Sequence, residues 1–288
     1  MNNPANSILL IGEYGAGKTH YGAQLLKRLM KGDGQLKMNG AATNLSPFEA
    51  TLRCLDEGIA GEHTPSSTYL DSVWPVIDDE KREGQLVWPD YGGEQIKHMT
   101  SMRRVSPEWK ARIENASIWI FLVRLHLLQI SDDVFTRSFR ELRTRRAPTD
   151  LNASTEESRI SSDQARLIEL LQICLYIRGV LGQSPIQRPK LMLLLTCWDE
   201  LESDSPPQVA LRDRMPMFAD FVSSNWDDPY ILGVSALGRP LDSQHRDAEY
   251  VTRGPENFGY VIQHDGARSP DLTLPIRILL ADSALRPR

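Results

Sequence analysis

A glycine-rich run close to the start of the chain, over residues 12–19, constrains the fold more than any other feature. The run reads GEYGAGKT and matches in full the pattern GxxxxGK followed by Ser or Thr. An apolar run at residues 7–11 comes directly before it and predicts a buried β-strand, and leucines at helical spacing follow over residues 20–31. In such a segment the strand leads into a turn in which glycine permits positive φ, and the turn leads into a helix N-terminus. Successive backbone N–H groups then point into one cavity, where they bind phosphate oxygens. The sequence therefore predicts an α/β fold with a nucleotide-binding site after its first strand.

The residues of this phosphate loop have expected roles in that site. The Lys18 amine is expected to reach the β- and γ-phosphates, and the Thr19 hydroxyl is expected to ligate Mg²⁺. The backbone amides around them are expected to bind the phosphate oxygens. The predicted phosphate-binding residues are Gly12, Glu13, Tyr14, Gly15, Ala16, Gly17, Lys18, Thr19 and His20.

Three further motifs each follow an apolar block. Residues 85–94 run from a short apolar segment into DYGGE, which contains the pattern DxxG. Residues 191–195 form an apolar block that is followed by TCWD at 196–199, and residues 230–234 form another that is followed by SAL at 235–237. Because the carboxyl ends of parallel strands meet at one edge of an open sheet, we expect all three motifs to lie beside the phosphate loop.

In this order the four motifs resemble the nucleotide-binding boxes of the Ras-like and translation-factor-like GTPases of the TRAFAC class. The resemblance implies that Asp90 holds Mg²⁺ through water and that the Gly93 N–H meets the γ-phosphate. It also implies that Asp199 accepts hydrogen bonds from guanine N1–H and the exocyclic amine, and that the Ser235 box brackets guanine O6 with a backbone N–H. The implied contacts of GTP or GDP beyond the phosphate loop are Gly93, Thr196, Cys197, Asp199, Ser235, Ala236 and Leu237.

The chain departs from these GTPases at two positions. Cys197 stands where the family has a lysine whose stem packs over the base, and Glu94 stands where Ras-like proteins have Gln and translation factors have His. Glu94 and Gln95 are the candidates for positioning the attacking water, and Lys18 is the candidate for neutralising charge. A carboxylate beside the γ-phosphate adds repulsion, so we expect slow intrinsic hydrolysis that a partner or self-association accelerates.

The switch I threonine, which closes on Mg²⁺ and the γ-phosphate in such GTPases, has two candidates here. Thr68 lies just before an apolar segment that predicts the second strand, and Thr64 lies beside a proline. The sequence slightly favours Thr68 and leaves both open.

The stretch at residues 90–94 and the tail at residues 259–276 are similar to the bacterial double-GTPase branch found in multi-gene conflict systems. The resemblance implies one three-layer P-loop GTPase domain over residues 1–288, with a mostly parallel six-stranded sheet, one antiparallel strand, and helices on both faces.

We expect strands at residues 7–11, 69–77, 85–89, 117–123, 190–196 and 230–235. Three regions exceed a minimal core, namely an enlarged switch I region at 32–67, a helical insertion at 125–189, and a C-terminal extension with a final helix at 242–288. Further helices are predicted at residues 47–57, 134–146, 162–181 and 206–225.

Two alternative functions remain open. Residues 193–200 also fit the Walker B strand of an ATPase, in which Asp199 would hold Mg²⁺ and Glu200 would polarise the attacking water. A nucleotide-locked scaffold that scarcely hydrolyses is the second alternative, because of the residues at Cys197 and Glu94. A nucleotide kinase is disfavoured, since the sequence has no basic lid motif of recognisable form.

Composition excludes several other classes. The net charge of −5 argues against a general nucleic-acid binder, and the three cysteines are too few and scattered for a disulfide frame or a zinc site. The longest apolar stretch, at residues 117–130, contains Arg124 and His126 and is shorter than a membrane span. We therefore expect a cytoplasmic protein. The resemblance to GTPases implies as its partners a guanine nucleotide, a protein effector or GTPase-activating partner, and a second copy in a nucleotide-dependent dimer.

Overall fold

The computed structural model describes residues 7–32, 34–61, 71–89, 94–127 and 163–285. At its centre lies a sheet with the strand order β2-β3-β4-β1-β5-β6-β7-β8-β9. Its five middle strands are parallel to one another, and each side-by-side pair aligns in register over three to six residues. These five strands are β4 (Glu83–Pro89), β1 (Ser7–Gly12), β5 (Ile118–Val123), β6 (Lys190–Thr196) and β7 (Tyr230–Ser235).

Antiparallel strands extend this parallel core at both edges. On one side β3 (Asp71–Asp78) pairs with β4 and β2 (Leu36–Met38) pairs with β3, and on the other β8 (Tyr260–Ile262) pairs with β7 and β9 (Arg268–Ser269) pairs with β8. The α/β class with a mostly parallel sheet is confirmed. The expectation of six strands with one antiparallel strand is wrong, because the described residues form nine strands and the pairing is antiparallel at both edges of the sheet. The three additional strands, β2, β8 and β9, are two or three residues long, too short to show the alternation that predicts a strand.

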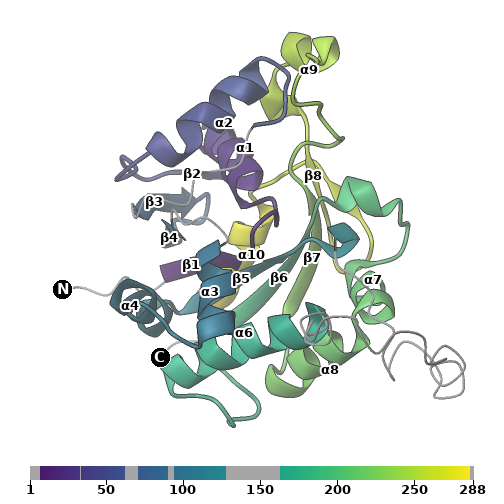
Figure 1. Ribbon diagram of the computed structural model, residues 1–288. Helices are drawn as coiled ribbons and strands as arrows, with labels where there is room; N and C mark the ends of the chain where they lie inside the picture. Colours follow the sequence, from purple (N-terminus) through teal and green to yellow (C-terminus); the bar gives the residue numbers. More distant parts are fainter. Residues whose placement is uncertain (1–6, 33, 62–70, 90–93, 128–162, 286–288) are drawn as a thin grey trace, which may run out of the picture.

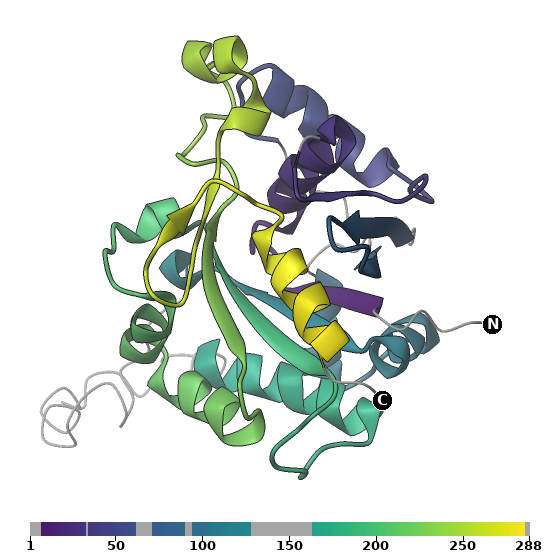
Figure 2. The same ribbon diagram turned by 180° about the vertical axis from the view of Figure 1, so that it is seen from behind.

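Helices cover both faces of the sheet, because the inner strands are apolar on both sides. In β1, Ile8 and Leu10 pack into one apolar core, and Leu9 and Ile11 pack into the other. Figures 1 and 2 show the two helical layers on opposite sides of the sheet. The first layer contains α1 (Lys18–Lys31), α2 (Ser46–Asp56) and α10 (Leu274–Leu285), and the second contains α3 (Glu94–Met102), α4 (Pro107–Asn115), α6 (Asp163–Arg178), α7 (Pro207–Arg214) and α8 (Pro216–Asn225).

The helix expected over residues 206–225 is two helices. Pro216 has no N–H to donate to the preceding turn, and Met215 takes up a non-helical conformation with φ −140° and ψ 60° between α7 and α8. The helix predicted at residues 134–146 lies outside the described residues.

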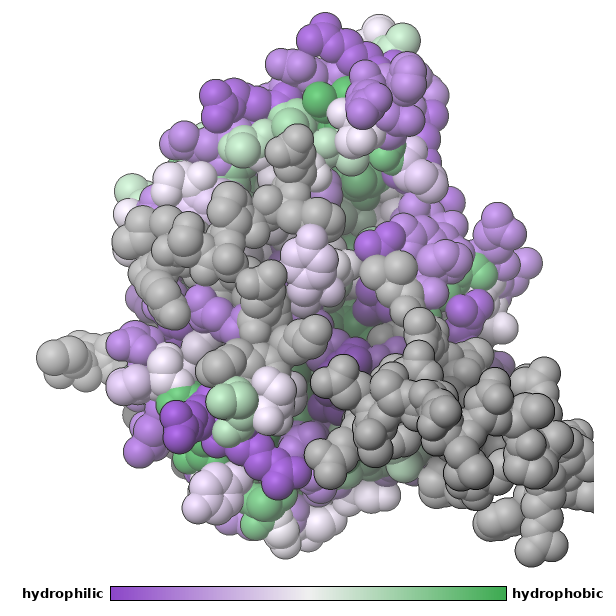
Figure 3. Space-filling model, viewed as in Figure 1, coloured by the Kyte–Doolittle hydropathy of each residue, from purple (hydrophilic) through white to green (hydrophobic). Residues whose placement is uncertain are grey.

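The exposed face of α2 is mostly polar, with Ser46, Glu49, Arg53 and Asp56 open to solvent. Figure 3 shows mainly hydrophilic residues over α2 and over α9 (Ala248–Arg253), whose Tyr250 is buried. No helix in the described part of the chain has both the length and the apolar character that a membrane crossing requires.

Candidate functional site

The phosphate loop joins the end of β1 to the start of α1, as predicted from its sequence. Gly15 and Gly17 have φ values of 75° and 73°, which glycine adopts without the strain that a Cβ would cause. A Cβ on Gly12 would lie 3.0 Å from the Cβ of Leu122 on the neighbouring strand. Glycine at these positions therefore lets the loop turn tightly against β5 and leaves a cradle lined by backbone.

The Lys18 side chain folds back over this loop. Its Nζ donates hydrogen bonds to the carbonyl oxygens of Gly12 and Glu13, both at 2.8 Å. Burial lowers the pKa of the Lys18 amine to about 7, although the nearby Glu13 carboxylate acts in the opposite direction. An anion bound against this amine would favour its charged form, which is the electrostatic condition for binding a phosphate.

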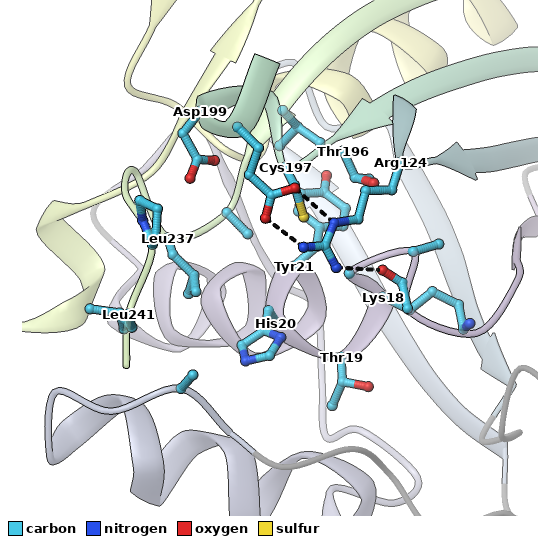
Figure 4. A pocket seen from close by; sticks show the side chains of 18 of the residues that line it. Lys18, Thr19, His20, Tyr21, Arg124, Thr196, Cys197, Asp199, Leu237 and Leu241 are labelled. Atoms are coloured by element: carbon cyan, nitrogen blue, oxygen red, sulfur yellow. Dashed lines mark hydrogen bonds and ion pairs between the residues drawn. The ribbon is translucent and has the colours of Figure 1, made fainter. Parts of the chain in front are cut away.

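One cavity brings the phosphate loop together with the ends of β6 and β7 (Figure 4). In Figure 4, Lys18 and Asp199 lie at opposite ends of the view. The predicted residues that line the cavity are Tyr14, Gly15, Ala16, Gly17, Lys18, Thr19, His20, Thr196, Cys197, Asp199, Ala236 and Leu237. Gly12, Glu13 and Ser235 belong to the same segments without lining it, and the Ser235 hydroxyl accepts a hydrogen bond from the Gly238 N–H at 2.9 Å.

Asp199 lies in a short 3₁₀ helix, η3 (Trp198–Leu201), directly after β6. Trp198 is buried, and it packs so closely on β7 that a Cβ on Gly233 would lie 2.5 Å from the Trp198 Cε3 atom. The anchored indole therefore determines where the next residue, Asp199, stands at the edge of the cavity.

Several lining residues were not predicted from the motifs. Ala60 comes from the segment after α2, and Arg239, Pro240 and Leu241 come from the loop that continues the SAL motif. The Arg239 guanidinium forms ion pairs with carboxylates of the C-terminal region and lies 4.8 Å from the centroid of the Phe258 ring. The only sequence signal for this arginine is its position four residues after Ser235.

Arg124 follows β5 and contacts two loops of the cavity. Its Nε donates to Glu200 Oε2 at 2.9 Å and its Nη2 to Glu200 Oε1 at 2.5 Å. Its Nη1 donates to the Gly15 carbonyl oxygen at 3.2 Å. The guanidinium thus lies between the phosphate loop and η3.

Thr196 adds a polar atom that has no partner within the described residues. The residue is 3% exposed and lines the cavity, and its buried Oγ1 makes no hydrogen bond to any described residue. A buried hydroxyl without a partner costs free energy, so this atom and the glycine cradle both fit a polar ligand in the cavity.

A model of the Double-GTPase 1 family matches residues 9–279 of the sequence. The chain belongs to this family of P-loop GTPases. None of the curated proteins matches the sequence significantly. Among solved structures, Methanosarcina barkeri Roco2 RocCORdC bound to GDP is similar, with 16% sequence identity and a TM-score of 0.32, over 92% of this chain and 51% of that one. This double-GTPase therefore spans about half the length of that structure.

Four predicted site residues of the double-GTPase, Thr64, Thr68, Asp90 and Gly93, lie outside the described residues. Thr19, the other predicted Mg²⁺ ligand, lines the cavity. Among the described residues, no group of three or more His, Cys, Asp or Glu side chains is placed to hold a metal ion.

The two predicted water-positioning residues lie at the start of α3. Glu94 is the first residue of this helix, and its role stays a prediction. The Gln95 Oε1 accepts a hydrogen bond from the Trp109 Nε1 of α4 at 3.2 Å, and Gln95 is not among the cavity-lining residues. In this arrangement the Gln95 amide is directed toward α4.

Proposed function

We propose that this double-GTPase binds GTP and GDP in the described cavity, hydrolyses GTP slowly with Mg²⁺, and acts as a molecular switch. The observation that carries the proposal is that the phosphate loop, residues 196–199 and residues 236–237 line one cavity although they are far apart in the sequence. A single nucleotide that spans this cavity would meet backbone amides and an amine at one end and a carboxylate at the other.

The residues have distinct roles in this proposal. Lys18 and the loop amides hold the phosphates, and Asp199 accepts hydrogen bonds from the guanine N1–H and amino group, which adenine cannot offer. The Thr19 hydroxyl would hold Mg²⁺ together with Asp90 and either Thr64 or Thr68, and the ion would supply charge neutralisation at the phosphates. The segments around Thr68 and Gly93 become ordered on the γ-phosphate and relax after its loss.

The strand order supports the GTPase function over the ATPase alternative. The strand β4 ends one residue before Asp90, and it pairs directly with β1, with Leu9 opposite Val87. Asp90 therefore follows a strand that neighbours the phosphate loop. The ATPase alternative gives Glu200 the task of polarising water, yet both of its carboxylate oxygens accept hydrogen bonds from Arg124.

Nucleotide competition on the purified protein tests this proposal. A fluorescent GDP analogue should bind in the presence of Mg²⁺ and should be displaced by GTP and GDP, while ADP and ATP at the same concentrations leave it bound. The K18A variant should lose retention of the analogue, because it lacks the amine at the phosphates. Preferential displacement by ATP, or undiminished retention by K18A, would contradict the proposal.

The D199N variant tests the guanine end of the cavity. An asparagine amide donates where the carboxylate accepted, so it disfavours the guanine amino group and suits the carbonyl oxygen of xanthine. We expect GDP affinity to fall by about 10- to 100-fold and affinity for xanthosine diphosphate to rise, since a hydrogen bond to a charged group contributes about 1.5–3 kcal/mol. Competition titrations with the two diphosphates measure this change in preference. An unchanged preference for GDP would show that Asp199 does not recognise the base.

A nucleotide-locked regulatory scaffold is the second candidate, and one contact favours it. The Gln95 side chain is held by Trp109, so it has to leave this partner before it can position a water molecule. A protein in which Gln95 never leaves Trp109 would bind GTP and scarcely hydrolyse it. Single-turnover hydrolysis, with and without a protein partner, separates the scaffold from the switch.

A further inference from the structure

Arg124 occupies the junction between the two loops that would hold opposite ends of a nucleotide. It follows the last residue of β5, and its guanidinium lies beside the phosphate loop and beside η3 (Figure 4). The three hydrogen bonds described above use its Nε, Nη1 and Nη2 atoms. The side chains of Arg124 and Glu200 are 26% and 20% exposed, so water screens this pair less than a pair on the open surface.

The phosphate-loop side of this contact is the carbonyl of Gly15, in a turn that requires positive φ. Gly15 has a φ of 75°, and its oxygen accepts a hydrogen bond from Arg124. In a loop that binds anions, the N–H groups point into the cradle, which requires the carbonyl oxygens to point outward. The Arg124 guanidinium holds one of these carbonyl oxygens in the outward direction.

The η3 side of the contact is a short segment that needs support. Its flanking residues, Cys197 and Glu202, have φ values of 51° and 47°, a region that residues with a Cβ rarely adopt. Glu200 is the neighbour of Asp199, and the Arg124 fork binds both of its carboxylate oxygens. This two-point contact restrains the orientation of η3 more strongly than a single hydrogen bond does.

From this geometry we infer that Arg124 is a positioning residue for nucleotide binding, which fastens the phosphate loop to the loop that carries Asp199, with Glu200 as its anchor. The inference rests on the proposed function. Both loops are then held at the separation that one nucleotide spans, so less ordering accompanies binding. Arg124 and Glu200 themselves line the cavity. In this inference Arg124 acts on the nucleotide through Gly15 and Asp199.

The test measures the dissociation constants of GDP and of inosine diphosphate. Inosine diphosphate lacks the amino group that, in the proposed function, donates a hydrogen bond to Asp199. In R124Q the Kd of GDP should rise by about 10- to 100-fold, the range expected for losing hydrogen bonds to charged groups. The preference for GDP over inosine diphosphate should fall toward unity, because Asp199 is no longer held in place. A variant that is merely less stable would bind both ligands more weakly in the same proportion, and that result would overturn the inference.

The E200Q variant and the double variant test the role of Glu200 as an anchor. E200Q should reproduce part of the R124Q defect, and R124Q/E200Q should be no worse than R124Q alone, because both changes break the same contact. Additive losses would overturn the anchoring role. R124K provides a second route if R124Q fails to fold: it keeps the charge without the planar fork, and it should lose the preference for GDP in the same way.

R277Q is the matched control. Arg277 on α10 pairs with Asp271, their side chains are 26% and 30% exposed, and neither residue lines the cavity. R277Q should leave both dissociation constants unchanged. If the unmodified protein does not bind GDP, the proposed function fails together with this inference, whereas GDP binding that is equal in the unmodified protein and R124Q overturns the inference alone.

Discussion

Cys197 stands in the TCWD motif at the position where the GTPases that the motif resembles have a lysine, so this position offers a thiol in place of a charged amine. The residue has a left-handed backbone conformation at the end of β6, and its Sγ would lie 3.5 Å from a Cβ placed on Gly17. Burial raises the pKa of the Cys197 thiol to about 12, with a smaller and opposite effect from Arg124. The thiol is therefore neutral near pH 7 and packs against the phosphate loop, where the related GTPases have a lysine.

This raised pKa predicts slow alkylation of Cys197. With a pKa of about 12, only about one thiol in ten thousand is ionised at pH 8, and the thiolate is the reactive form. The rate of reaction with iodoacetamide should rise about tenfold for each pH unit between pH 7 and 9, and GDP should slow it further because Cys197 lines the cavity. Peptide mass spectrometry measures the rate at this site, with buried Cys174 as the internal reference. A rate that levels off below pH 8 would contradict the prediction.

At the scale of elements, an aromatic cluster joins α1 and α2 to the β3–β4 hairpin. The rings of Trp74 and Trp88 stack with centroids 5.1 Å apart, and Phe48 meets both of them edge-on at 5.0 and 5.4 Å. Gly22 of α1 lies against this cluster, since a Cβ there would be 2.6 Å from the Trp88 Cζ2 atom and would also collide with Phe48. The helix that begins at Lys18 and the strand that leads to Asp90 are thus packed as one unit.

The G22A substitution should therefore destabilise the protein. Alanine favours a helix interior by about 1 kcal/mol over glycine, but forcing a methyl group between rigid rings costs about 1–3 kcal/mol. We expect the free energy of unfolding to fall by up to about 2 kcal/mol, visible as a lower urea midpoint with an unchanged slope. M30A on the exposed face of the same helix is the control and should change it by less than about 0.5 kcal/mol. A midpoint that rises in G22A would show that the cluster repacks freely.

At the scale of the whole molecule, the cavity is connected to the C-terminal region. The Ala60 N–H donates to the Asp242 carbonyl and the Asp247 N–H donates to the Gly58 carbonyl, both at 2.9 Å. Residues 58–60 lead toward Thr64 and Thr68, and residue 242 follows the loop of residues 239–241, which lines the cavity. The chain that leads to the predicted switch I threonines is therefore held against the side of the molecule that would bind the base.

This arrangement, with Gln95 directed toward Trp109, predicts slow turnover of GTP by the isolated protein. We expect a single-turnover rate constant of the order of 10⁻³ s⁻¹ at micromolar protein with Mg²⁺, typical of P-loop GTPases without an activating partner. The rate of hydrolysis should rise with protein concentration if a second copy supplies a group that positions the attacking water. It should also rise on addition of an activating partner protein. Release of radiolabelled phosphate measures it, and fast hydrolysis by the dilute monomer would contradict this prediction.

Local sequence predicted the phosphate loop and its flanking strand and helix because neighbouring residues alone determine them. The motif GEYGAGKT predicts a turn in which glycines have positive φ, and Gly15 and Gly17 have it. Lys18 follows this turn, as the motif requires. The TCWD and SAL motifs were also placed correctly beside the loop, since parallel strands that follow crossover helices end at the same edge of a sheet. The edge strands β2, β8 and β9 and the interruption at Pro216 were not predicted, because pairing partners and helix ends depend on more than periodicity.

The sequence by itself determined which residues are candidates for binding the phosphates and the base, because residue type and spacing are local properties of the chain. Only the tertiary structure decided that Arg124 contacts both Gly15 and Glu200, that Gln95 is held by Trp109, and that Arg239 lines the cavity. These contacts join residues 14 to 109 positions apart, and no pattern in a single sequence encodes which of many arginines and carboxylates meet. Their pairing follows from how the helices and strands pack around the two faces of the sheet.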